Sequence, residues 1–150
     1  MNFNYFVDDN IPTNKMPAYQ TQGSAGFDLI YYNCEDHCIE DDISIIIRPG
    51  EIATLNTGFA ITAMSEDLYL DIRPRSSLTK RGLFFYGSGV IDSDFLYPNR
   101  ILVPVKNSSS NPVTIERFDR IAQALIIPII RINIPILDTT REGGFGSTGK

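Results

Sequence analysis

The strongest constraint on the fold of this 150-residue chain is a series of short apolar runs separated by turn residues. The runs are rich in β-branched residues or alternate apolar with small and polar residues, as strands do. No stretch has a long helical period, and we find no internal repeat or domain boundary. Strands at this spacing predict one all-β sandwich or barrel. The clearest strand candidates are 43–48, 58–63, 68–73, 100–106, 113–118 and 121–130.

One polar stretch, RSSLTKRGL at 75–83, interrupts this pattern. A serine pair at its start and a glycine near its end can cap one or two helical turns, so we predict a short helix here. Free backbone amides and the helix dipole favour an anion at such a start. Arg75, Ser76 and Ser77 are therefore candidate phosphate ligands.

Composition restricts the classes of function. A formal net charge of -5 argues against a general nucleic-acid binder, which needs a basic face, although a few arginines in a cleft can still bind a small anion. The most apolar stretch, ALIIPII, is too short to span a bilayer. The N-terminus has no secretory pattern, and Cys34 and Cys38 are too few for a disulfide scaffold. We expect an intracellular protein with neither a nucleic-acid nor a membrane partner.

Two aspartates and a glutamine stand at positions where strands and turns meet. Asp28 follows a small-residue turn, Asp92 ends an apolar run, and Gln123 lies on an expected strand with Asp119 and Arg120 available to pair. Taken singly, each aspartate is more simply interpreted as a turn residue, and Asp119 and Arg120 as a structural ion pair.

The last segment, 138–150, has four glycines and differs from the rest of the chain. A disordered terminus is the simple interpretation. The alternative is a lid that orders over a ligand, since glycines let the backbone wrap phosphates closely. Arg141 adds a charge, Ser147 and Thr148 add hydroxyls, and Phe145 offers a face for stacking on a base.

Five motifs, taken in order, resemble those of the trimeric dUTPase family. They are AGFDL at 25–29, PRSSL at 74–78, GVIDSD at 89–94, DRIAQ at 119–123 and GGFGSTG at 143–149. The resemblance implies a distorted jelly-roll subunit of the β-clip type, with a core at 1–137 and the lid at 138–150. It also implies a homotrimer with shared active sites, which hydrolyses dUTP to dUMP and pyrophosphate with Mg²⁺.

The same resemblance assigns roles to individual residues. Asp92 would be the general base that activates the attacking water, a task that a carboxylate performs without histidine. Asp28 would hold the hydrated metal through water. The phosphates would be contacted by Arg75, Ser76, Ser77, Gln123, Arg141, Ser147 and Thr148, and the uracil and deoxyribose by Gly87, Ser88, Gly89, Tyr97, Phe95 and Phe145.

The stretch after Asp92 departs from the family pattern of acid, tyrosine, any residue and glycine. The glycine is missing, and the spacing to the family-like Asn107 is two residues longer than usual, which favours an insertion. If the motif is aligned without a gap, Phe95 lies beneath the deoxyribose. If two residues are inserted, Tyr97 does. We favour Tyr97 because Pro98 biases it toward an extended conformation next to the turn.

Two other functions fit parts of the sequence. RSSLTKRGL also resembles a motif of the dCTP deaminases, but these need a glutamate on the strand before Asn107, where RILVPVK has no acid. A binder that has lost catalysis is the second alternative, although the chain keeps Asp92, Arg75 and the whole tail motif. CEDHC at 34–38 lacks an evident fourth zinc ligand, so we expect a plain loop there.

Overall fold

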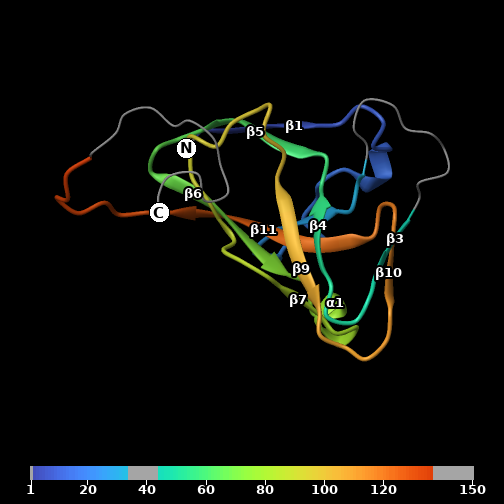
Figure 1. Cartoon of the computed structure of the whole chain (residues 1–150). Helices are drawn as coiled ribbons and strands as arrows, with labels where there is room; N and C mark the ends of the chain where they lie inside the picture. The colour runs from blue at the N-terminus through green and yellow to red at the C-terminus, as the bar shows by residue number, and fades with distance from the viewer. Residues whose placement is uncertain (1, 34–43, 137–150) are drawn as a thin grey trace.

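The computed structural model describes residues 2–33 and 44–136, and it is mostly β, with one short α-helix and a 3-10 turn at Thr13–Lys15 (Figure 1). The predicted all-β fold is confirmed as a jelly-roll. The CEDHC stretch and the C-terminal segment from 137 onward lie outside the described residues. The strands are β1 (Phe3–Val7), β2 (Phe27–Ile30), β3 (Ser44–Ile47), β4 (Ile52–Asn56), β5 (Phe59–Met64), β6 (Leu68–Pro74), β7 (Leu83–Phe85), β8 (Val90–Ile91), β9 (Leu102–Asn107), β10 (Val113–Glu116) and β11 (Arg120–Pro128).

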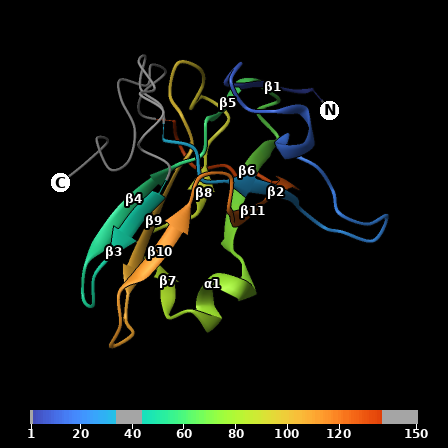
Figure 2. The ribbon, with the colours of Figure 1, turned by 90° about the vertical axis from the view of Figure 1, so that its right-hand side faces the viewer.

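The strands of the described residues pair in antiparallel sheets that bring distant parts of the chain together (Figures 1 and 2). The largest sheet has the order β2-β11-β6-β8, so β11 lies between a strand from the start of the chain and one from its middle. A three-stranded sheet has the order β4-β9-β7, and β1 pairs with β5 and β3 with β10. These long-range pairings place the motifs AGFDL and DRIAQ side by side, with the start of PRSSL next to them.

Alternation along the strands builds one main core. On β9 every second residue is buried, and β4 and β5 contribute fully buried side chains such as Leu55 and Ile61. Burying a side chain of this kind stabilises the fold by about 1.5–3 kcal/mol. All six predicted runs contain a strand, namely β3, β5, β6, β9, β10 and β11.

The predicted helix is present as α1 (Ser76–Lys80), but its cap differs from the expectation. Arg75 is the N-cap residue, and no side chain caps the helix start, so the predicted serine cap is wrong. Ser76 and Ser77 are exposed instead. Gly82 has φ +84° just past the helix end, which is the terminating role predicted for it. Leu78 is buried and anchors the helix to the core.

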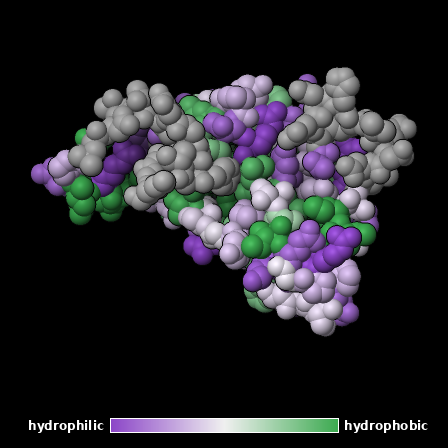
Figure 3. Space-filling model, viewed as in Figure 1, coloured by the Kyte–Doolittle hydropathy of each residue, from purple (hydrophilic) through white to green (hydrophobic). Residues whose placement is uncertain are grey.

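The segment 129–136, which follows β11, leaves apolar side chains uncovered. Ile130, Ile132, Ile134 and Ile136 are all well exposed, at every second position. Figure 3 shows hydrophobic atoms at the left edge of the molecule, where Figure 1 places this segment. Within residues 2–33 and 44–136, no helix has the length and apolar character needed to cross a membrane.

Candidate active site

Three of the predicted phosphate and metal residues lie together at one end of the largest sheet. β11 places Gln123 directly opposite Asp28 of β2, and on its other side opposite Arg73 of β6. Opposite residues on neighbouring strands have side chains on the same face. Arg75 follows β6 immediately and reaches the same carboxylate. We call Asp28, Arg75, Arg120 and Gln123 the acid–arginine cluster.

Asp28 is the centre of this cluster. Its side chain is only 4% exposed, and its Oδ2 lies 3.0 Å from Nη1 of Arg75 and 3.2 Å from Nη1 of Arg120. A buried carboxylate is costly unless it is paired, and the two guanidinium groups offset that cost. The sequence did not indicate this pairing with Arg120, because the two residues are 92 positions apart.

The adjacent residues Asp119 and Arg120 do not pair with each other as expected. Successive side chains on an extended chain point to opposite faces, so neighbours cannot meet. Asp119 instead lies 3.7 Å from Arg81, and its carboxylate accepts a hydrogen bond from the Glu116 N–H.

Two polar atoms of the acid–arginine cluster are buried without a hydrogen-bond partner. They are Oδ1 of Asp28 and Nη1 of Arg75. Nη1 lies 3.0 Å from Oδ2 of Asp28, which makes an ion pair, but its geometry does not meet that of a hydrogen bond. Buried polar groups are nearly always satisfied, so such a pair indicates a place for ligand or water atoms. Asp28 Oδ1 can accept a hydrogen bond from a water molecule, and Arg75 Nη1 can donate one to an anion.

A polar cavity of about 370 Å³ opens beside Asp28. It is lined by Lys15 and Gln20 from the loop before β2 and by Arg120 on β11. Phe118, which forms part of its wall, has φ +69°, an unusual conformation for a large side chain. Sequence reasoning missed the Lys15 and Gln20 contribution, because nothing in their local sequence marks them as site residues.

The described residues fit a water-mediated metal contact rather than a closed metal cage. Among them, no three His, Cys, Asp or Glu side chains gather closely enough to enclose an ion. Mg²⁺ usually keeps several waters and binds through one or two carboxylates together with substrate phosphates. The unpartnered Oδ1 of Asp28 is suited to accept a hydrogen bond from such a water.

The predicted uracil-binding turn, Gly87 to Gly89, packs closely against β6. The Ile72 N–H donates to the Gly89 carbonyl at 2.7 Å, and a Cβ at Gly89 would lie 2.1 Å from the Ile72 carbonyl oxygen. Gly87 has φ +142°, which side chains rarely tolerate, and Ser88 Oγ accepts the Val90 N–H. The turn therefore requires glycine at both ends and exposes its middle.

Asp92 follows β8 and is exposed, with its carbonyl accepting the Phe95 N–H at 3.1 Å. The two candidate sugar-facing aromatics lie in different surroundings. Phe95 is 4% exposed and belongs to the hydrophobic core, whereas Tyr97 is 51% exposed. Within one chain, only the ring of Tyr97 is accessible without rearrangement.

The structure does not bring Asp92 to the acid–arginine cluster of the same chain. Ile91 pairs with Leu70 on the antiparallel strand β6, so Asp92 is level with Tyr69, six residues before Arg75. At about 3.3 Å per residue, Asp92 is therefore roughly 20 Å from Arg75 along the strand. Arg141, Phe145, Ser147 and Thr148 lie outside the described residues.

Comparison with known proteins identifies close relatives. The dUTPase family model matches residues 13–149. The deoxyuridine 5'-triphosphate nucleotidohydrolase of Nautilia profundicola is 42% identical over 142 residues, which cover 90% of this chain and 91% of the relative.

Two solved structures extend the comparison to the fold. The dUTPase of Streptococcus mutans has a TM-score of 0.70 and 26% identity, over 86% of this chain and 98% of its own. A variant dUTPase from phage phi11 of S. aureus, described as coordinating a structural Mg(II) ion, has a TM-score of 0.70 and 16% identity, over 95% and 100%. The chain therefore shares its jelly-roll fold with these enzymes over nearly its whole length.

Proposed function

The chain belongs to the dUTPase family, and we propose that it is a dUTP diphosphatase, which hydrolyses dUTP to dUMP and pyrophosphate. The observation that carries this proposal is the acid–arginine cluster beside a polar cavity of about 370 Å³, where Arg75 and Arg120 supply positive charge for a triphosphate. Because nucleoside triphosphates are held inside cells, the proposal includes an intracellular location, with no nucleic-acid or membrane partner.

Asp92 acts in this proposal as the general base. Its carboxylate takes a proton from a water whose oxygen attacks the α-phosphorus. The bond from the α-phosphorus to the bridging oxygen breaks, and pyrophosphate leaves with the bond's electrons. Arg75 and Gln123, with the exposed Ser76 and Ser77 beside them, hold the phosphate oxygens where negative charge develops, which lowers the barrier.

Asp28 is the residue that would hold Mg²⁺, through a water at Oδ1 rather than directly. When bound, the ion supplies positive charge to the triphosphate oxygens. A metal held largely by the substrate and by water needs only one such carboxylate from the protein.

The nucleoside is recognised by the backbone of one turn and by the size of one side chain. The Gly87–Gly89 turn pairs with the uracil edge through its backbone, because its middle residue, Ser88, is exposed. Tyr97 lies beneath the deoxyribose and rejects a ribose by its size, and its exposed ring supports this choice over the buried Phe95. The segment 138–150 closes as a lid, with Phe145 on the base and Arg141, Ser147 and Thr148 on the phosphates.

A second copy of the chain completes the site. Asp92 lies roughly 20 Å from the acid–arginine cluster of its own chain by strand register, so the base must come from a neighbouring copy. The alternating exposed isoleucines of 129–136 form an apolar strip that suits burial against another subunit. A homotrimer with shared sites satisfies both observations.

One assay tests the proposal against its alternatives. The purified protein is incubated with dUTP, UTP, dTTP and dCTP and Mg²⁺, and pyrophosphate and ammonia are measured. We expect rapid pyrophosphate release from dUTP alone. Ammonia from dCTP would instead identify a deaminase, and nucleotide binding without any product would identify a non-catalytic homologue.

A further inference from the structure

The ring of Tyr97 is held by a second aromatic ring and a guanidinium group. The Phe6 ring centroid lies 5.1 Å from that of Tyr97. The guanidinium carbon of Arg100 lies 5.2 Å from the Tyr97 centroid and 4.6 Å from the Phe6 centroid. A guanidinium at these distances is attracted to both ring faces. Tyr97 is thus exposed, yet its orientation depends on Arg100.

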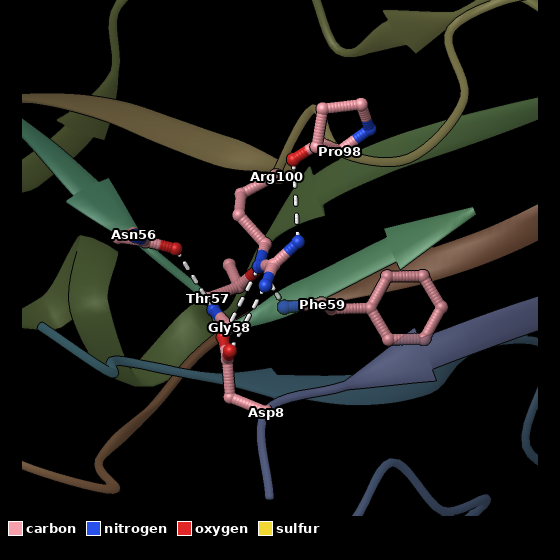
Figure 4. A network of polar contacts seen from close by, with 7 residues as sticks. All are labelled: Asp8, Asn56, Thr57, Gly58, Phe59, Pro98 and Arg100. Atoms are coloured by element: carbon pink, nitrogen blue, oxygen red, sulfur yellow. Dashed lines mark hydrogen bonds and ion pairs between the residues drawn. The ribbon is translucent and has the colours of Figure 1, made fainter. Parts of the chain in front are cut away.

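Arg100 is itself fixed by a forked ion pair with Asp8 at the end of β1 (Figure 4). Its Nε donates to Oδ2 at 3.1 Å and its Nη2 donates to Oδ1 at 2.9 Å. The third nitrogen, Nη1, donates to the Pro98 carbonyl at 3.2 Å. Hydrogen bonds to Asp8 raise the pKa of the Arg100 guanidinium above its usual value, so the fold favours the charged form of Arg100.

Asp8 is anchored in turn by the tight turn between β4 and β5. Its N–H donates to the Gly58 carbonyl at 3.0 Å. Gly58 has φ +64°, and a Cβ there would lie 2.7 Å from the Tyr32 ring and 3.0 Å from Asp8 Oδ2. In the same turn, Thr57 Oγ1 donates to the carbonyl of Ile101, the residue after Arg100, at 2.7 Å. Both ends of the ion pair therefore rest on one rigid turn.

We propose that Arg100, held by Asp8, is a positioning residue that sets the orientation of Tyr97 and thereby the discrimination between dUTP and UTP. The inference rests on the proposed function, in which Tyr97 lies beneath the deoxyribose. A ring that rejects a single hydroxyl by bulk must be held in place, because a ring that can turn aside admits the larger sugar. The Tyr97 N–H donates to the Ile61 carbonyl at 2.7 Å, but that backbone bond does not fix the ring.

The test compares Arg100→Gln, which removes the fork and the charge, with Arg100→Lys, which keeps the charge but loses the planar fork. Arg48→Gln is the control, because Arg48 is an exposed arginine in the turn between β3 and β4 that the proposed function does not use. The values of kcat/KM for dUTP and UTP are measured for each variant. We expect the UTP-to-dUTP ratio to rise about tenfold in Arg100→Gln, less in Arg100→Lys, and not at all in the control.

Tyr97→Ala and the double variant with Arg100→Gln separate positioning from general stability. If Arg100 acts only through Tyr97, Tyr97→Ala raises the ratio at least as much, and adding Arg100→Gln raises it no further. A merely structural role for Arg100 would not produce this non-additivity.

The possible failures are distinguishable. If Arg100→Gln keeps the parent's UTP-to-dUTP ratio while Tyr97→Ala raises it, Arg100 has no positioning role, but Tyr97 still acts as the sugar gate. If Tyr97→Ala does not change the UTP-to-dUTP ratio, Tyr97 is not the sugar gate either. If the parent protein does not hydrolyse dUTP, the proposed function itself is wrong. If Arg100→Gln does not fold, Arg100→Lys and Asp8→Asn decide the question by the same ratio.

Discussion

Gly89 is the position where one added methyl group perturbs the site most. Its Cβ would lie 2.1 Å from the Ile72 carbonyl oxygen, 3.1 Å from the carbonyl carbon and 3.4 Å from the nitrogen. All three are backbone atoms of β6, so no side chain can turn away. Gly89→Ala must push the turn off β6 by more than 1 Å, roughly the gap to an ordinary van der Waals contact.

The cost follows from the contacts that this shift breaks. The 2.7 Å hydrogen bond from the Ile72 N–H to the Gly89 carbonyl is lost next to a buried strand, which costs about 1–3 kcal/mol. Overpacking adds about 1–3 kcal/mol. We expect a loss of about 2–6 kcal/mol in the free energy of unfolding, and a Tm lower by about 4–24 °C for a chain of this size.

The assay is thermal unfolding at one protein concentration, together with the initial rate of pyrophosphate release from dUTP. Gly23→Ala is the control, since a Cβ there meets nothing within 4 Å. We expect Gly89→Ala to lose most turnover because the uracil-binding backbone is displaced, while Gly23→Ala behaves like the parent. A Gly89→Ala protein with the parent's Tm and rate would refute the close packing of this turn.

Four further predictions concern the base, the lid, the sugar gate and the core. Asp92→Asn keeps the shape but removes the proton acceptor, so turnover should fall by about 10²–10⁴-fold while equilibrium binding of dUMP is kept; near-full activity would exclude Asp92 as the base. Deleting 141–150 should leave a folded trimer by light scattering that has lost most turnover, and an undiminished rate would exclude a lid. Tyr97→Ala should raise UTP hydrolysis relative to dUTP more than Phe95→Ala does; the reverse order in a kcat/KM comparison would put Phe95 under the sugar. Phe95→Ala should instead lower the free energy of unfolding by about 3–5 kcal/mol, because its ring is buried in the core.

Local patterns predicted six of the eleven strands in the described residues, because those runs are β-branched or alternate apolar with polar residues. The alternation of β9 and the β-branched run of β3 are visible in a window of a few residues. β8 has only two residues, Val90 and Ile91, and exists because β6 pairs with it. A strand defined by its partner leaves too little pattern in its own sequence to be predicted.

The site could be predicted motif by motif but not as an arrangement. Asp28 was expected to face a metal, yet its two arginine partners depend on β11 lying between β2 and β6. Asp8 and Arg100 are likewise 92 positions apart, and neither has a local pattern that indicates the other. Pairings of this kind follow from long-range strand register, which no short window of sequence contains.

Mixing two inactive variants tests the shared active site most directly. Asp92→Asn lacks the base, and Arg75→Ala lacks a phosphate-binding residue of the acid–arginine cluster. If each site takes Asp92 from one chain and Arg75 from another, subunits co-refolded in equal amounts give about a quarter of sites with both residues intact. We predict that pyrophosphate release from dUTP recovers to about a quarter of the parent rate. A mixture no more active than the two variants measured separately would contradict the account, because both residues would then act within one chain.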